Sequence, residues 1–192
     1  FQGNVGQKNG KLTVHLPKTA GSEQASADLF LRVPFESKLQ IQAGLGGVTV
    51  KGSQSNLQIR SDLGDITLEQ HSGDADLKTA LGSIKIVDCQ FPAELKAVTD
   101  LGSVLLEGPL AKRTVLESKL GDIDILLAPE AAYVLKGEIN LGSFKSEVPF
   151  QGRKGEKLIE GIIGSGEQRG VLFVKLDLGS LSFKILHDKK ED

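Results

Sequence analysis

The chain has 192 residues, enough for one domain with a sizeable core or for two small ones. A formal net charge of −2, with 23 basic residues scattered among 25 acidic ones, excludes the basic stripe that nucleic-acid binding requires. No apolar run reaches the ~18 residues of a membrane span, and the single cysteine, Cys89, excludes an internal disulfide and a cysteine-based zinc site.

The N-terminal region differs from the rest of the chain. The sequence has no methionine and begins with FQG. We therefore expect residues 1–9 to be a leader or the remnant of a cleaved tag, and a signal peptide to have been removed earlier. Apolar residues alternate over 10–17, which predicts a first strand or cap, and the polar stretch 18–26 predicts a loop. We expect one domain over 10–186 and a charged tail over 187–192.

A motif, Leu-Gly-x-apolar, recurs along most of the chain. Successive copies are 18, 18, 20, 19, 21 and 37 residues apart. The last interval is about two periods, and Ile163-Gly164-Ser165 inside it is interpreted as a degenerate copy. Self-similarity at about twenty residues is typical of a solenoid. The glycines of the seven copies, which we expect to be structural corners, are Gly46, Gly64, Gly82, Gly102, Gly121, Gly142 and Gly179.

The alternation of apolar residues breaks at each of these glycines. Leu81 and Ile84 are three positions apart, so a straight strand would point them to opposite faces. If both face the core, the chain bends at Gly82, since glycine tolerates such a bend. The Asp or Ser that follows glycine can accept a hydrogen bond from a local backbone N–H. We therefore expect a column of buried leucines that includes Leu81 and Leu101.

Further turns, such as residues 71–74, close each period, so that one period is strand, corner, strand, turn. The sequence thus predicts an all-β fold, a right-handed two-sheet β-solenoid similar to a single-stranded β-helix, with seven to nine coils of ~18–21 residues. The left-handed hexapeptide helix is excluded, because its rule would place Glu69 and Ala75 inside. Residues 128–132 predict a turn or a single helical turn, and residues 161–170 predict an exposed hairpin tip.

The chain resembles a known bacterial family. The stretch LFLRVPFESKLQIQAGLGGVTVKGSQSNLQIRSDLGDITLEQHSGDADLKTALGSIKI has a strand ending in Val-Pro, a short polar loop and tandem Gly-Asp/Ser-Ile corners. The later stretches LAPEAAYVLKGEINLGSFKSEVPF and IEGIIGSGEQRGVLFVKLDLGSLSFKIL match the family's closing part. Over about residues 10–186 this is similar to the bacterial adhesin-like family, a domain of unknown function also called the toastrack domain. Here all seven copies carry Leu before Gly, where many members have a polar residue.

The resemblance implies a β-solenoid with two sheets, mostly in envelope-associated or secreted bacterial proteins. Related domains occur in proteins of membrane-stress signalling. The family supplies no catalytic residues that could be carried over to this chain.

Carboxylates gather near the corners, and stacked Asp side chains can bind Ca²⁺. However, Ala80 and Lys119 interrupt the column that precedes Leu-Gly, and the calcium-binding motif Gly-Gly-x-Gly-x-Asp is absent. We therefore expect turn capping and no metal site. The carboxylates in question are Asp62, Asp65, Asp100, Asp122, Asp124 and Asp177.

No constellation predicts catalysis. The outward strand positions are mixed and no paired acids recur at one site. The three histidines, His15, His71 and His187, lie in different parts of the chain and are not spaced as metal ligands, so we expect them on the surface or in turns. Cys89 follows a strand, and we expect it to be a small packed residue and not a nucleophile. We expect no enzyme, no catalytic residue and no cofactor.

These observations predict a non-enzymatic binding, adhesion or envelope-stress scaffold domain, located in the cell envelope or periplasm or secreted. Its partner would be a protein or glycan surface, with no nucleic acid, and the chain would be a monomer or weak homo-oligomer. Two alternatives stay open: a polysaccharide-binding or polysaccharide-cleaving β-helix, and a scaffold that polymerises end to end.

Overall fold

The structure is a computed structural model, and it describes residues 4–8, 11–15, 30 and 32–187. The chain divides into two compact units, Phe1–Arg32 and Val33–Asp192. In the first unit, β1 (Asn4–Lys8) pairs antiparallel with β2 (Lys11–His15). The strand predicted over 10–17 is therefore confirmed, and β1 occupies the stretch expected to be a leader. The loop expected over 18–26 and most of the expected tail lie outside the described residues.

The second unit consists of strands that bend at the repeated glycines. The strands before the corners are β3 (Leu39–Leu45), β5 (Leu57–Leu63), β7 (Ala75–Leu81), β9 (Glu94–Leu101) and β11 (Arg113–Leu120). The strands after the corners are β4 (Val48–Lys51), β6 (Ile66–Glu69), β8 (Ile84–Val87), β10 (Val104–Glu107) and β12 (Ile123–Leu127). The closing strands are β13 (Ala131–Ser146), β14 (Phe150–Lys154), β15 (Leu158–Gly164) and β16 (Glu167–Ile185).

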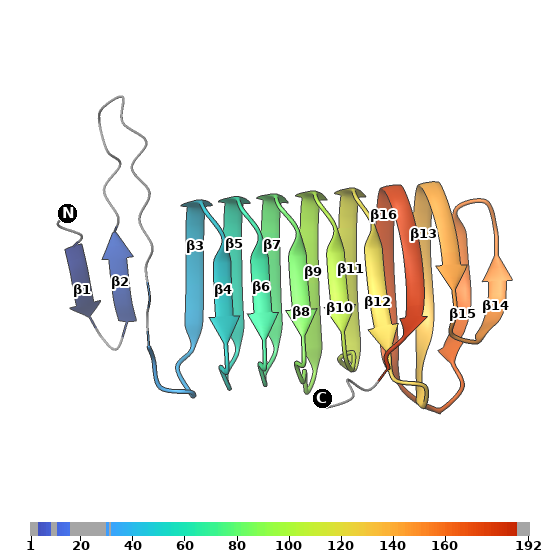
Figure 1. Cartoon of the computed structure of the whole chain (residues 1–192), viewed down its shortest axis with the longest axis horizontal. Coiled ribbons are helices and arrows are strands. Elements are labelled where there is room, and N and C mark those ends of the chain that lie inside the picture. Colours follow the sequence, from blue (N-terminus) through green and yellow to red (C-terminus); the bar gives the residue numbers. More distant parts are fainter. Residues whose placement is uncertain (1–3, 9–10, 16–29, 31, 188–192) are drawn as a thin grey trace. The chain divides into compact units, whose positions relative to one another are not determined.

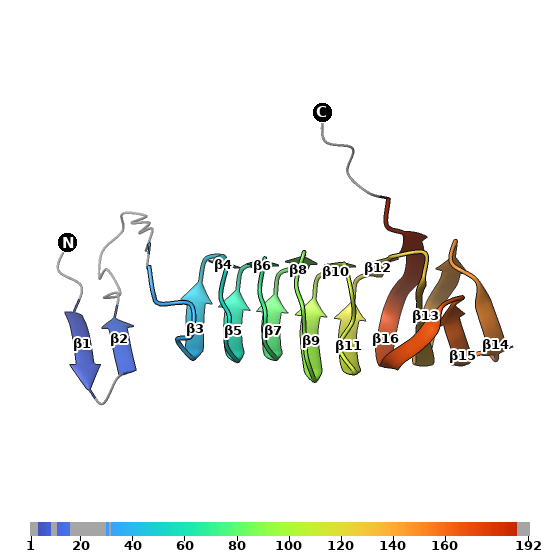
Figure 2. The same ribbon diagram turned by 90° about the horizontal axis from the view of Figure 1, so that it is seen from below.

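Equivalent strands of successive coils pair in parallel. One row runs β3-β5-β7-β9-β11 and the other runs β4-β6-β8-β10-β12, and β16 joins both rows through its two halves. In Figure 1 the chain ascends along β3, crosses forward at the corner and descends along β4, and Figure 2 shows the two rows edge-on. The coils therefore wind right-handed, as parallel crossovers generally do. The predicted all-β, two-sheet solenoid is confirmed.

The core lies between the two rows and is built from columns of aliphatic side chains. Inward positions recur every second residue along each strand, and the parallel register places each beside its equivalent in the next coil. One column from the first row is Ile59, Leu77, Ala97, Leu116 and Val174. One column from the second row is Ile66, Ile84, Val104, Ile123 and Leu181.

The prediction that the corner leucines form a buried column is wrong. Leu81 and Leu101 are each 42% exposed, whereas Leu77 is completely buried. The register pairs Thr79 with Thr99 and Leu81 with Leu101 but passes over Ala80, so the inside-outside alternation ends before the leucine. Thr79 is the last residue whose side chain faces inward at this corner. The leucine that follows is therefore left outside.

The final part of the chain departs from the simple repeat. β13 pairs in parallel with β16 along both halves, which makes β16 and β13 two further levels beyond five regular coils. Seven levels fall within the predicted range. The long interval before Gly179 is not two periods, because β15 returns antiparallel to β13 and Gly164 ends that strand. The hairpin tip expected over 161–170 is also wrong, since β15 and β16 both pair with β13 and lie on either side of it.

The turn predicted over 128–132 is confirmed by the hydrogen bond from the Ala131 N–H to the Ala128 carbonyl at 3.0 Å.

Leu77 and Leu81 are four residues apart on one strand and form a matched pair for measuring what the core contributes. Leu77→Ala should lower the free energy of unfolding by ~2–5 kcal/mol, because the cavity it leaves is enclosed. Leu81→Ala should cost less than about 1 kcal/mol, because Leu81 is 42% exposed and its truncation leaves no enclosed cavity. Urea unfolding monitored by circular dichroism would measure both, and equal costs at the two positions would contradict the placement of the leucines.

Candidate interaction surface along the corners

The corner glycines bring the backbones of adjacent coils into direct contact. Gly82 has a φ of +150°, and the N–H of Gly82 donates to the Leu101 carbonyl at 2.9 Å. A β-carbon added at Gly82 would overlap the carbonyl oxygen of Gly64 in the preceding coil. Five of the seven predicted corner glycines share this geometry, with φ between +144° and +150°: Gly64, Gly82, Gly102, Gly121 and Gly179.

The other two corner glycines differ. Gly46, in the first coil of this unit, has a φ of +103° and open space around it. Gly142 lies inside the continuous strand β13, opposite Gly179, where a β-carbon would overlap the Gly179 carbonyl oxygen.

A line of buried hydroxyl groups closes three of the corners from the inside. The Thr79 hydroxyl donates to the Gly64 carbonyl at 2.9 Å, and the Thr99 hydroxyl donates to the Gly82 carbonyl at 2.8 Å. The Ser118 hydroxyl donates to the Gly102 carbonyl at 3.0 Å. Because a buried polar group is costly when unpaired, these short side chains satisfy themselves by tying each coil to the one before.

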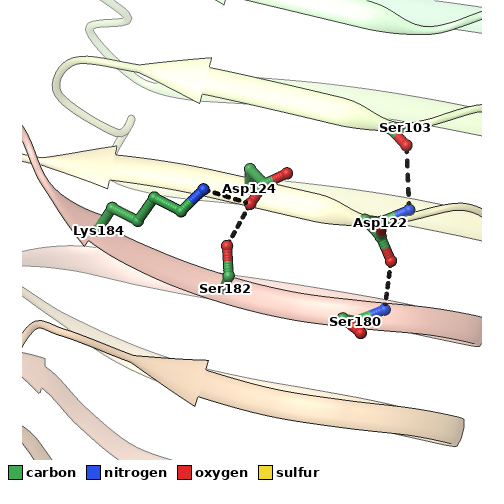
Figure 3. A network of polar contacts seen from close by, with 6 residues as sticks. All are labelled: Ser103, Asp122, Asp124, Ser180, Ser182 and Lys184. Atoms are coloured by element: carbon green, nitrogen blue, oxygen red, sulfur yellow. Dashed lines mark hydrogen bonds and ion pairs between the residues drawn. The ribbon is translucent and has the colours of Figure 1, made fainter.

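The Asp and Ser residues that follow the glycines form a second line on the outside. Asp65 accepts the backbone N–H of Ser83 at 2.7 Å, and the Ser83 hydroxyl accepts the N–H of Ser103 at 3.2 Å. Figure 3 shows the next steps, in which Ser103 accepts the N–H of Asp122 at 3.2 Å and Asp122 accepts the N–H of Ser180 at 2.7 Å. The sequence predicted a local cap. The N–H that is capped belongs to the next coil instead.

Three of the other corner carboxylates are also engaged by neighbouring coils, among them Asp177, which accepts the side-chain N–H of Asn140 at 3.0 Å. Asp124 accepts the Ser182 hydroxyl and lies 3.3 Å from the Lys184 ammonium nitrogen (Figure 3). Asp100 lies 2.8 Å from the Lys119 ammonium, and that hydrogen bond raises the pKa of Lys119. Within the described residues, no three His, Cys, Asp or Glu side chains gather as a metal site.

The corner leucines form a straight exposed row along one edge of the coils. The register places each leucine beside its equivalent from β3 through β16 to β13, with exposed fractions between 39% and 79%. We call this the leucine row; its order in space is Leu45, Leu63, Leu81, Leu101, Leu120, Leu178 and Leu141. The sequence identified these leucines but predicted that they face the core, whereas they are partly exposed to solvent.

A second surface feature lies over the outer face of β11, β16, β13 and β15. It is an open trench of about 250 Å³ whose lining includes Phe173, Val115 and Leu158. The guanidinium of Arg113 lies 4.6 Å from the centre of the Phe173 ring. The trench could not be predicted, because its strands are separated by long intervals in the chain and are brought together only by the closing topology.

The turn between β6 and β7 contains a buried histidine. His71 is 1% exposed, its Nδ1 lies 2.6 Å from the Ser53 hydroxyl, and its Nε2 lies 3.0 Å from the Gly73 carbonyl. This geometry assigns the ring proton to Nε2, which donates to Gly73, and makes Nδ1 the acceptor. Burial lowers the pKa of His71 below 6.5. The turn role predicted for His71 is confirmed, but the residue is not on the surface.

Cys89 packs close to this turn. Its side chain is 1% exposed, and its thiol donates to the Val87 carbonyl at 3.2 Å. Burial raises the pKa of the thiol, so the reactive thiolate is disfavoured. The prediction of a small packed residue is confirmed.

Together, the coil geometry and the surfaces define a parallel β-solenoid that presents long rows of identical side chains. The model of the Toastrack family, DUF4097, matches residues 1–173, and the chain belongs to this family. The resemblance noted from the sequence is therefore confirmed. No curated protein matches the chain.

A solved structure shares the fold. It is a Clostridium sporogenes protein described as a candidate cell adhesion protein, at 12% sequence identity and a TM-score of 0.50. The match covers 79% of this chain and 93% of the other. Within the residues described here, no helix is long and apolar enough to cross a membrane.

Gly82 should not tolerate a side chain. Gly82→Ala should lower the free energy of unfolding by about 1–3 kcal/mol, since it combines an unfavourable φ with overlap on the Gly64 carbonyl. Gly44→Ala is the control, because Gly44 has no left-handed φ and nothing near its β-carbon position. Thermal melts of both variants would test this, and an unchanged melting temperature for Gly82→Ala would contradict the stacked corner.

His71 should make stability depend on pH. Well above pH 6.5 the histidine is neutral in both the folded and unfolded states. Below it, the unfolded state binds a proton that the folded state resists, so stability should fall with pH until the lowered folded pKa is passed. His71→Gln should therefore lose less stability than the wild type between about pH 7 and pH 5. Urea titrations at several pH values would measure both slopes, and equal slopes for His71→Gln and the wild type would contradict this role of His71.

Proposed function

We propose that this chain is a non-enzymatic binding module that attaches to a partner surface through the leucine row. The observation that carries the proposal is the row itself, with seven partly exposed leucines aligned on one edge. Scattered exposed apolar residues are ordinary, but a contiguous exposed apolar strip is typical of an interaction site.

The leucines are not needed to complete the core. The columns on both sides of the corner are already filled by aliphatic residues and by the buried hydroxyl groups of Thr79, Thr99 and Ser118. Fully burying a leucine side chain contributes ~1.5–3 kcal/mol, so covering several leucines in a row would supply substantial binding energy. A partner that lies along the coils would cover all of them at once.

Other features support a role without catalysis. Five of the six corner carboxylates accept hydrogen bonds or form ion pairs with neighbouring coils, and both ring nitrogens of His71 are hydrogen-bonded. The buried thiol of Cys89 suits an oxidising compartment, because it cannot easily pair with another molecule. We place the domain outside the cytoplasm, in the cell envelope or secreted, as an adhesion or envelope-scaffold module. The description of the Clostridium protein as a candidate cell adhesion protein agrees with this proposal.

An adhesion assay would test the leucine row. Beads carrying the protein should be retained by immobilised bacterial envelope preparations, and Leu63→Ser, Leu81→Ser, Leu101→Ser and Leu120→Ser combined should reduce retention by about tenfold or more, since the covered apolar area is lost. Ile162→Ser is the matched control, because Ile162 is 40% exposed, close to the 42% of Leu81, but lies on β15, away from both the row and the trench. Circular dichroism would verify that each variant is folded.

A second candidate function is glycan binding in the trench. It is favoured by the ring of Phe173 on an open sheet face beside charged side chains such as Lys136 and Glu160. The same adhesion assay distinguishes the two sites. If retention survives the leucine substitutions but is lost in Phe173→Ala and is competed by soluble polysaccharide, the trench and not the leucine row is the binding site.

A further inference from the structure

We propose that the leucine row docks a cationic amphipathic helix of about 19 residues, supplied by a partner protein. This inference rests on the proposed function and specifies the chemistry of the partner. It depends on two independent properties of the row, its spacing and the charge of its borders.

The spacing of the row suits a helix that lies along it. Neighbouring leucines are separated by the distance between paired strands, about 4.8 Å, and six such steps make a row of about 29 Å. One helical turn rises about 5.4 Å, so apolar side chains at helical spacing stay near successive leucines, and 29 Å corresponds to about 19 residues. An extended strand repeats its side chains every ~6.8 Å and would lose register with the row after about two steps.

Acidic residues border the row on both sides. The residue before the leucine is Asp in three coils, and the second residue after it is Asp in two. One ammonium group, that of Lys119, interrupts the border and is paired with Asp100 at 2.8 Å. With that pair neutral, four carboxylates remain beside the leucines: Asp62, Asp65, Asp122 and Asp177. The next positions outward along the strands, such as Arg60, Lys78 and Glu117, carry both signs.

This border selects among possible occupants. Two copies of the chain that met through their leucine rows would bring their acidic borders together, which is unfavourable because like charges repel at short range. An anionic lipid surface would meet the same repulsion. A helix with leucines on one face and lysines or arginines on both flanks would satisfy the apolar row and the carboxylates together.

Designed peptides test the inference directly. A fluorescent peptide of about 20 residues, with a leucine stripe at helical spacing and lysines on both flanks, would be titrated with the full chain by fluorescence anisotropy. A second peptide keeps the stripe and replaces each lysine with glutamate. The lysine peptide should bind at least about tenfold more tightly, and the preference should shrink as salt is added.

Variants of the chain locate the site. Leu81→Ser with Leu101→Ser should weaken binding of the lysine peptide by about tenfold or more, while Ile162→Ser should not. Asp62→Asn with Asp177→Asn should weaken binding of the lysine peptide and reduce its advantage in affinity over the glutamate peptide. Glu147→Gln with Glu156→Gln removes two exposed carboxylates away from the row and is the control for charge.

Several results would overturn the inference. Equal or tighter binding of the glutamate peptide would refute the cationic partner, and binding unaffected by Leu81→Ser with Leu101→Ser would refute the site. A self-association in sedimentation velocity that is lost in the leucine variant would identify a second copy as the occupant. Leucine-dependent partition into phosphatidylcholine vesicles would identify a lipid surface. If neither peptide binds while bead adhesion still depends on the leucines, the helix is refuted and the proposed function stands.

Discussion

The close approach of backbones at the glycine corners is the constraint on which the rest of this structure depends. At Gly82 the chain turns with a left-handed φ, and its α-carbon faces the carbonyl oxygen of Gly64 without room for a β-carbon. The backbone of each coil therefore packs directly against the backbone of the coil before it. The buried hydroxyl of Thr79 on the inside and the carboxylate of Asp65 on the outside hold the same junction from both sides. Because equivalent contacts recur at successive corners, through the hydroxyls of Thr99 and Ser118 on the inside and through Ser83, Ser103 and Asp122 on the outside, the coils keep a common register.

A common register converts single positions of the repeat into continuous rows. The β-branched or aliphatic residue after the corner becomes a buried column, as Ile66 and Ile84 show. The leucine before the glycine becomes an exposed strip, and the Asp residues beside it become its acidic border. In such a quasi-one-dimensional fold each repeat contacts only its neighbours, so a binding surface is built by repetition of one residue and not by convergence of distant loops. The proposed helix partner matches this linear arrangement.

The two ends of the stack of coils differ in structure. At the C-terminal side, β16 inserts beside β11 and β12, and β13 then runs along the whole of β16. β15 and β14 follow in antiparallel order, so the parallel rows end in a mixed sheet. Within Val33–Asp192, the other side ends with β3 and β4. The insertion of β16 also creates the trench around Phe173, because it places strands from separate parts of the chain next to one another.

The sequence by itself determined the solenoid, because alternation with a period of two and a Leu-Gly interval near twenty residues are geometric signals that few other folds satisfy. It also located the bends, since a run such as Leu81 to Ile84 cannot keep both apolar residues on one face of a straight strand. Only the tertiary structure decided which way the leucines point. The alternation of inward and outward side chains breaks twice at the corner, because the strand pairing passes over Ala80 and the chain also bends at Gly82. The alternation of apolar residues in the sequence indicated only one of these two breaks. The caps that join coils, such as Asp65 to the N–H of Ser83, and the burial of His71 against Ser53 were equally beyond the sequence. Each joins residues eighteen positions apart, and that distance closes only when one coil is stacked on the next.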